Sequence, residues 1–192
     1  MMVKICGITN QADADLCVEA GASALGFNFH EPSPRFIAPV QAAAIAGALP
    51  PAVTKVGIFV TQDAAMIEQM TREIGLDVAQ VYGEARPSAV RYWRACHAGN
   101  FSQELANGAE AVLLDTPGGA MPGGTGKTFD WTAARGLTLR VIIAGGLDET
   151  NVRAAIDAAQ PWGVDACSRL ESSPGRKDAQ KVRKFIQAAL NR

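Results

Sequence analysis

The sequence has few of the residues that build metal centres, disulfide frameworks and nucleic-acid surfaces. Its 192 residues include only two histidines, His30 and His97, and four cysteines that form no CxxC pair. Eighteen basic and 19 acidic residues leave a formal net charge of -1, with no basic block. Neither histidine lies near a nucleophile motif. We therefore expect no metal site and no nucleic-acid partner.

Long apolar runs are absent too. No apolar stretch reaches the roughly 18 residues that a membrane span needs, and the start, MMVKICGIT, lacks a signal-peptide core. The composition, 48% hydrophobic and 19% charged, is that of an ordinary globular protein. We expect no membrane partner, a cytoplasmic location and a single domain over residues 1–192. The cysteines, Cys6, Cys17, Cys96 and Cys167, are then expected to be free thiols.

What the sequence does contain is a repeated alternation of helix and strand. Helix-like stretches run to a glycine, and a short apolar run follows, at Gly21, Gly75, Gly108, Gly136 and Gly163. Apolar runs with little alternation are typical of strands covered on both faces. The pattern predicts strands near residues 3–6, 23–28, 54–60, 78–82, 110–115, 140–144 and 164–168. It predicts helices over residues 11–20, 40–48, 64–74, 149–159 and 178–190, with Asn10 and Asp178 as N-caps.

The segment between Gly83 and Ala109 decides the fold class. Residues 90–96 (VRYWRAC) are aromatic and β-branched and supply an eighth strand. Eight alternating strands predict an α/β fold, a single (β/α)8 TIM barrel. Residues 84–89 are too few for an ordinary helix, so helix four is expected to be shortened or missing. The alternatives are a helix over residues 88–97 and an open doubly wound sheet.

The residues that close each strand are candidates for the active site, because a parallel barrel places its site at the carboxyl ends of its strands. Lys4 shares a strand face with Cys6, as Asp165 does with Cys167. If these faces point inward, Lys4 and Asp165 can form a buried ion pair. A nearby ammonium would make Cys6 a candidate general base, and burial would make Asp115 a candidate acid. The alternatives are an apolar role for Cys6 and a capping role for Asp115.

Glycine-rich loops predict that the ligand is a small phosphorylated molecule. Gly145 and Gly146 follow strand seven and Ser168 closes strand eight, where free N–H groups suit a phosphate. The loop over residues 123–127 (GGTGK), which contains Gly124, lacks the spacing of a P-loop. A flexible linker is the alternative for that loop.

A different loop, residues 32–36 (PSPRF), follows strand two. Its prolines restrict the backbone around Arg35, and an arginine there can bind a carboxylate with two hydrogen bonds. We expect this loop to lie far around the barrel from the loops after strands seven and eight. A solvated surface arginine is the alternative.

Taken in order, several segments resemble the phosphoribosylanthranilate isomerase family. They are KICGIT (4–9), GFNFHEPSPRF (26–36), VGIFV (56–60), LLDTP (113–117), GGTGKTFDW (123–131), AGGL (144–147), GVD (163–165) and SPGRKD (173–178). The resemblance implies a barrel enzyme of tryptophan biosynthesis. It implies an Amadori rearrangement of N-(5-phosphoribosyl)anthranilate, an aminoaldose, to an aminoketose, with no metal or organic cofactor.

The resemblance also implies roles for residues. Asp115 matches the general acid that opens the furanose ring, and Cys6 matches the general base that removes the C2 proton. Arg35 matches the residue that holds the anthranilate carboxylate. The remaining matches form the phosphate cradle and the cover over the site: Gly145, Gly146, the backbone at 167–169, and the loop that contains Gly124.

The chain departs from the family pattern at two positions of the site. Tyr82 stands where the family commonly has a histidine, and Arg169 replaces a phosphate-loop glycine, where we expect it near the substrate phosphate. Lys4, Asp165 and Tyr82 are expected to support the site, and the protein to be a monomer or homodimer. Two alternative functions are another sugar-phosphate isomerase, such as that of the histidine pathway, and a non-catalytic phosphometabolite-binding barrel. An aspartate is expected in place of Cys6 in the histidine-pathway branch.

Overall fold

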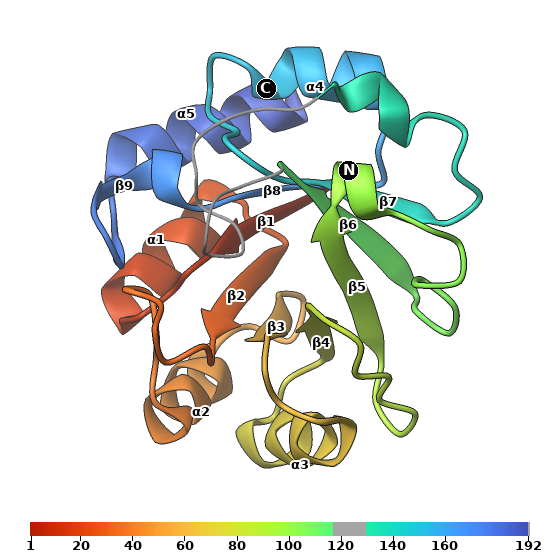
Figure 1. The fold of residues 1–192 in the computed structure, drawn as a ribbon. Coiled ribbons are helices and arrows are strands. Elements are labelled where there is room, and N and C mark those ends of the chain that lie inside the picture. The colour runs from red at the N-terminus through yellow and green to blue at the C-terminus, as the bar shows by residue number, and fades with distance from the viewer. Residues whose placement is uncertain (117–129, 192) are drawn as a thin grey trace.

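Eight parallel strands form a closed barrel in the computed structural model, which describes residues 1–116 and 130–191 (Figure 1). Each strand pairs with the next along the chain, and the last pairs with the first. This closure confirms the (β/α)8 prediction over the open sheet. The strands are β1 (Met2–Cys6), β2 (Ala24–Asn28), β3 (Thr54–Phe59), β4 (Val78–Val81), β5 (Tyr92–His97), β6 (Ala111–Asp115), β7 (Arg140–Ile143) and β8 (Gly163–Ala166).

The described residues form five α-helices, which lie outside the barrel (Figure 1). They are α1 (Gln11–Ala20), α2 (Pro39–Ala48), α3 (Ala64–Ile74), α4 (Val152–Ala159) and α5 (Ala179–Leu190). The expected start of the fourth of these at residue 149 is wrong. The Asp148 side chain accepts from the Thr150 N–H at 2.9 Å, and the Asn151 side chain accepts from the Asp148 N–H at 2.9 Å. These bonds hold a turn, so the helix begins at Val152.

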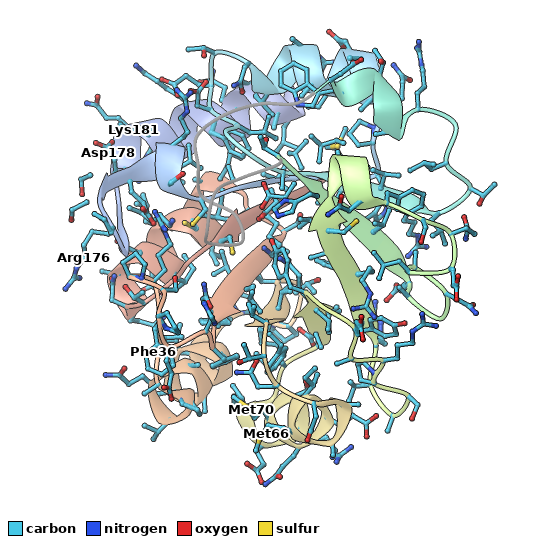
Figure 2. The ribbon with its side chains drawn as sticks, viewed as in Figure 1. Phe36, Met66, Met70, Arg176, Asp178 and Lys181 are labelled. Carbon is cyan, nitrogen blue, oxygen red and sulfur yellow. The ribbon has the colours of Figure 1, made fainter. Side chains whose placement is uncertain are left out.

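Side-chain caps and glycines set half of the ends of the described α-helices. Asn10 accepts from the Asp13 N–H, and Asp178 from the N–H groups of Gln180 and Lys181, as predicted for these N-caps. Figure 2 shows Asp178 and Lys181 together at the start of α5. Gly21 and Gly75 end α1 and α3 in the left-handed conformation.

Gly163 does not end a helix, because it is the first residue of β8. Helix α4 ends instead at Gln160, which adopts the left-handed conformation with φ 52°. A Cβ at position 163 would lie 3.0 Å from the Met2 carbonyl oxygen, so this glycine allows close approach of β8 to β1.

Strand five is present, and the connection from β4 to β5 contains no helix. β5 pairs in parallel with β4 and β6, so the alternative of a helix over residues 88–97 is wrong. Residues 82–91 contain no helix, and a single 3-10 turn, Ala98–Asn100, follows β5. Figure 1 shows no α-helix beside β5, in contrast to the side of the barrel formed by β1, β2 and β3, which α1, α2 and α3 cover.

The Arg94 side chain occupies the place where a covering helix would pack. It is fully buried on the outer face of β5. Its guanidinium donates to the carbonyls of Gly83 at 2.5 Å, Ala85 at 2.7 Å and Leu105 at 3.2 Å. Buried carbonyls without a donor are costly, so Arg94 supplies the hydrogen bonds that let both helix-free connections lie against the barrel.

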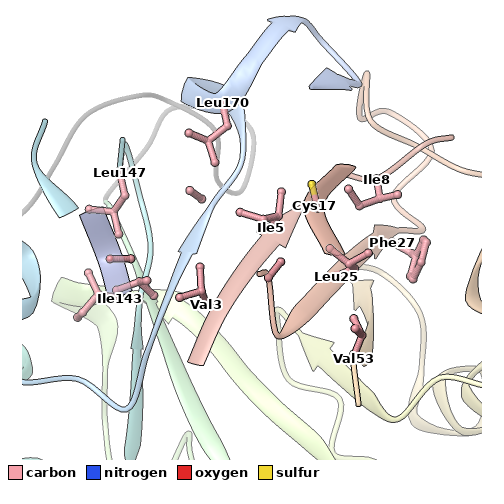
Figure 3. Close-up of a cluster of buried hydrophobic side chains, with 14 of the residues drawn as sticks. Val3, Ile5, Ile8, Cys17, Leu25, Phe27, Val53, Ile143, Leu147 and Leu170 are labelled. Carbon is pink, nitrogen blue, oxygen red and sulfur yellow. The ribbon is translucent and has the colours of Figure 1, made fainter. Parts of the chain in front are cut away.

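Two apolar layers make up the core. The outer layer lies between the strands and the helices, and Figure 3 shows Val3 and Ile5 of β1, Leu25 of β2 and Ile143 of β7 within it. The inner layer fills the barrel with alternate strand residues, among them Val56, Val78, Trp93, Leu113 and Ile142. None of the described helices is long and apolar enough to cross a membrane.

Replacing Arg94 by Met should lower the free energy of unfolding by about 3 kcal/mol or more, because it leaves several buried carbonyls without donors at ~1–3 kcal/mol each. The matched control is Arg91→Met, in the same connection. The Arg91 side chain is 61% exposed and pairs with Glu110, so its loss should cost about 1 kcal/mol or less. Urea unfolding of both variants measures the difference, and equal losses would contradict the role of Arg94.

Candidate active site

A buried ion pair joins β1 and β8 inside the barrel. Lys4 and Asp165 are partners in the strand register, and Lys4 Nζ lies 2.9 Å from Asp165 Oδ1. The pair expected from the strand faces is therefore present. Gly26 makes room for it, because a Cβ there would lie 2.9 Å from Cys6 Sγ and 3.1 Å from Lys4 Nζ.

Cys6 lies two residues after Lys4 on the same face and remains partly exposed. Its pKa is lowered to about 7, and the largest cause is a hydrogen bond with the Cys167 thiol. Burial raises the pKa, and the Lys4 charge lowers it. An ordinary cysteine titrates near ~8.5, so Cys6 holds far more thiolate at neutral pH than such a residue would.

Asp115 lies at the end of β6 and is 5% exposed. Its Oδ1 accepts from the Thr116 N–H at 2.8 Å, and the Tyr82 hydroxyl donates to Oδ2 at 3.4 Å. Burial is the main cause that raises the pKa of Asp115, and these hydrogen bonds oppose it. A Cβ at position 145 would lie 2.7 Å from Asp115 Oδ1, so Gly145 is needed where this carboxyl meets the next loop.

His97 is a neighbour of this acid that the sequence did not indicate. It is the register partner of Asp115 on β5, and its Nδ1 lies 3.0 Å from the Thr116 carbonyl oxygen. No motif surrounds it in the sequence. Only the prediction of residues 90–96 as a strand, extended by one residue, could have placed it at the mouth of the barrel.

Arg35 forms a bidentate ion pair with Glu171, the first residue of β9 (Glu171–Ser173). Nε lies 3.0 Å from Oε1 and Nη2 lies 2.8 Å from Oε2. The expectation that this loop lies far from the segment after strand eight is wrong. β1 alone separates β2 from β8 in the closed barrel, so the two loops meet across its end.

Glu171 and Lys177 are charged residues whose pairing sequence reasoning missed. Lys177, in β10 (Arg176–Lys177), places its Nζ 3.0 Å from Glu171 Oε1, and both side chains are buried. Burial opposes ionisation of Glu171, but its bonds to Arg35 and Lys177 outweigh that effect and lower its pKa. We call Arg35, Glu171 and Lys177 the rim network.

Four of the five predicted phosphate-binding residues line one pocket. Its lining includes Asp115, Gly145, Gly146, Ser168 and Arg169. Gly145 and Gly146 both have positive φ, which glycine adopts without strain. Arg169 Nη1 lies 3.1 Å from Asp148 Oδ2.

Two further predictions concern the loop that contains Gly124 and the helix after Gly146. Gly124, with its loop, lies outside the described residues. The helix expected shortly after Gly146 starts later, after the turn at Asp148, so its N-terminus is offset from the two glycines.

Comparisons with known proteins agree along the whole chain. A family model described as N-(5'phosphoribosyl)anthranilate (PRA) isomerase matches residues 3–188. The N-(5'-phosphoribosyl)anthranilate isomerase of Solibacter usitatus is 47% identical, covering 98% of this chain and 97% of that protein. The phosphoribosylanthranilate isomerase structure from Thermotoga maritima has a TM-score of 0.88 at 35% identity, with 100% of both chains covered.

One further similar structure contains a bound ligand. It is a phosphoribosylanthranilate isomerase in complex with reduced 1-(o-carboxyphenylamino)-1-deoxyribulose 5-phosphate. Its TM-score is 0.84 at 33% identity, with 100% of both chains covered.

Alkylation by iodoacetamide should single out Cys6 near neutral pH. The rate at Cys6 should rise with a midpoint near pH 7, because its pKa is about 7 and the thiolate is the reactive form. Cys17 and Cys96 are internal controls, since burial raises their pKa values to about 12 and about 11. Peptide mass spectrometry across pH 5–10 reads each site. A Cys6 midpoint near its ordinary ~8.5 would contradict the assignment.

Proposed function

The chain belongs to the N-(5'-phosphoribosyl)anthranilate isomerase family, and we propose that Cys6 and Asp115 are its general base and general acid. The reaction is the isomerisation of N-(5'-phosphoribosyl)anthranilate in tryptophan biosynthesis. One observation carries this proposal. A partly exposed thiol with a pKa of about 7 and a buried carboxyl with a raised pKa lie at the same end of the barrel.

Asp115 acts first. Its protonated carboxyl donates a proton to the furanose ring oxygen as the bond between that oxygen and C1 breaks, and the nitrogen lone pair forms the C1=N bond of a Schiff base. A carboxyl does this near neutral pH only if its environment favours the protonated form. The burial of Asp115 supplies that condition, and the Thr116 N–H and Tyr82 hydroxyl hold the group in place.

Cys6 acts second. Its thiolate removes the proton from C2, and the C2–H electrons form a C1=C2 double bond while the C=N electrons return to nitrogen. The resulting enolamine takes a proton at C1 and loses its C2 hydroxyl proton, which yields the aminoketose. Proton transfers of this kind need a base with a pKa near the working pH, and Cys6 meets that requirement.

The substrate has an anionic group at each end, a phosphate and a carboxylate, and we propose that different residues bind each of them. We assign the phosphate to Gly145, Gly146, Ser168 and Arg169 around the pocket, with Gly124 from the loop over residues 123–127. Arg35 takes the anthranilate carboxylate. Its bonds to Glu171 use Nε and Nη2, and among the described residues Nη1 makes no hydrogen bond, so that nitrogen can donate to a ligand.

The alternatives have less support. A histidine-pathway isomerase is expected to carry an aspartate where this chain has Cys6. A non-catalytic binding barrel has no use for a thiol and a carboxyl with pKa values shifted toward neutrality, and turnover of phosphoribosylanthranilate tests it. The cytoplasmic location and the monomeric or dimeric state stay predictions.

Cys6→Ala and Asp115→Asn should each lower kcat/KM by about 10²-fold or more, since acid–base groups contribute ~10²–10⁴-fold. Cys17→Ala is the matched control and should retain activity, because Cys17 is buried in the outer layer. Circular dichroism checks that each variant is folded. Near-normal turnover of phosphoribosylanthranilate by either active-site variant would contradict the catalytic role proposed for that residue.

Arg35→Ala should weaken binding of the anthranilate substrate by ~10- to 150-fold, the equivalent of one charge-assisted hydrogen bond of about 1.5–3 kcal/mol. An analogue built on aniline lacks the carboxylate and should bind the variant nearly as well as the unaltered protein. Arg169→Ala is the control on the phosphate side and should weaken both compounds alike. Equal losses for both compounds in Arg35→Ala would mean that Arg35 acts on the phosphate or on loop structure.

A further inference from the structure

Three consecutive backbone N–H groups follow β7, in the loop at the proposed phosphate pocket. They belong to Gly145, Gly146 and Leu147, which all line that pocket. Among the residues that the structure describes, these N–H groups donate to no backbone or side-chain acceptor. Gly146 and Leu147 are buried, and a buried N–H without an acceptor is costly. An anion in the pocket would satisfy these groups, provided that they point toward it.

The Asn151 side chain holds this loop. Its Nδ2 donates to the Gly146 carbonyl oxygen at 2.9 Å, and its Oδ1 accepts from the Asp148 N–H at 2.9 Å. Asn151 is the N-cap residue of α4, yet its side chain makes no cap bond to the helix. Such a bond is the usual role of an asparagine at that position. Here the amide binds the loop instead.

The bond to Gly146 determines the direction of the next N–H group. The Gly146 carbonyl and the Leu147 N–H belong to one trans peptide, in which the two groups point in opposite directions. Asn151 is not among the residues that line the pocket, whereas Leu147 is. A carbonyl held toward Asn151 therefore directs the Leu147 N–H toward the pocket. The Leu147 side chain packs in the outer apolar layer (Figure 3), so this residue offers the pocket its backbone.

The turn that contains Asn151 is also joined to the other wall of the pocket. Asp148 is buried, and its Oδ1 accepts from the Thr150 N–H at 2.9 Å. Its Oδ2 lies 3.1 Å from Nη1 of Arg169, which follows β8. The turn thus connects the loop after β7 to the segment after β8. Its own side chains fix it before a ligand binds, which lowers the entropy lost on binding.

We propose that Asn151 is a positioning residue that holds the Gly146 carbonyl and so presents the Leu147 N–H to the substrate phosphate. The proposal rests on the proposed function for the place of the phosphate. It adds the Leu147 backbone to the groups that bind the phosphate, and it gives Asn151 a role that involves no contact with the substrate.

The experiment titrates the protein with inorganic phosphate and follows the backbone N–H resonances of Gly145, Gly146 and Leu147 by NMR. Asn151→Ser keeps a neutral residue that is a good N-cap, but its side chain is too short to bridge Gly146 and Asp148. Phosphate should bind this variant about 2- to 12-fold more weakly, the equivalent of one hydrogen bond. KM for phosphoribosylanthranilate should rise by the same factor, with kcat changed much less.

Asp63→Ala is the matched control, because Asp63 is an exposed N-cap residue that does cap its helix. Its side chain accepts from the Met66 N–H at 2.8 Å at the start of α3. This variant should have a lower melting temperature and an unchanged affinity for phosphate. Asn151→Ser should show the reverse, because it loses a bond to the loop and no bond to the helix. Asn151→Thr is also a neutral N-cap variant and replaces Asn151→Ser if that protein does not fold.

An unchanged phosphate affinity in the Asn151 variant would overturn the proposal, as would a lower melting temperature with an unchanged KM. So would a Leu147 resonance that stays fixed while those of Gly145 and Gly146 shift in the unaltered chain. If phosphate shifts none of the three resonances in the unaltered chain, the proposed place of the phosphate fails as well. The titration needs no turnover, so it still tests Asn151 if Cys6→Ala retains full activity and the proposed catalysis fails.

Discussion

The closing seam of the barrel, between β1 and β8, carries the interaction on which the site depends. Lys4 and Asp165 lie buried there, 2.9 Å apart. Either charge alone would be very costly in the barrel interior, and pairing is what makes both tolerable. The seam also determines which residues come next: Cys6 above Lys4 and Cys167 above Asp165. The same register that closes the sheet therefore places a positive charge below the base and a thiol beside it.

The rim network extends this arrangement outward from the seam. Glu171 binds Arg35 from the loop after β2 and Lys177 from β10, and these segments flank the end of β1 on both sides. Arg35 is thus fixed by the protein before any ligand arrives, so little side-chain entropy remains to be lost when it binds a carboxylate.

The features of this molecule that could be predicted from the sequence are those that follow from the periodic pattern of its residues. Alternation along strands was enough to predict the Lys4–Asp165 pair, and the count of residues 84–89 was enough to predict a strand with no helix before it. Contacts between loops leave no periodic pattern in the sequence, so the Arg35–Glu171 pair could not be predicted. The prediction that the Arg35 loop lies far from the segment after strand eight was wrong for the same reason. The late start of α4 depends on side-chain bonds of Asp148 and Asn151 that compete with helix formation. His97 lay one residue beyond the predicted strand.

The helix-free connections on either side of β5 have an electrostatic consequence for the acid. The N-terminus of a helix carries a partial positive charge that stabilises nearby anions and lowers the pKa of carboxyls. In a barrel of this kind helix N-termini face the carboxyl ends of the strands, and α1, α4 and α5 follow β1, β7 and β8 in the chain. The connections that Arg94 holds, after β4 and β5, present no such dipole beside Asp115. The mouth of the barrel is thus uneven in its helix dipoles: α1, α4 and α5 follow β1, β7 and β8, whereas the connections after β4 and β5 add no helix N-terminus that would counter the burial that raises the pKa of Asp115.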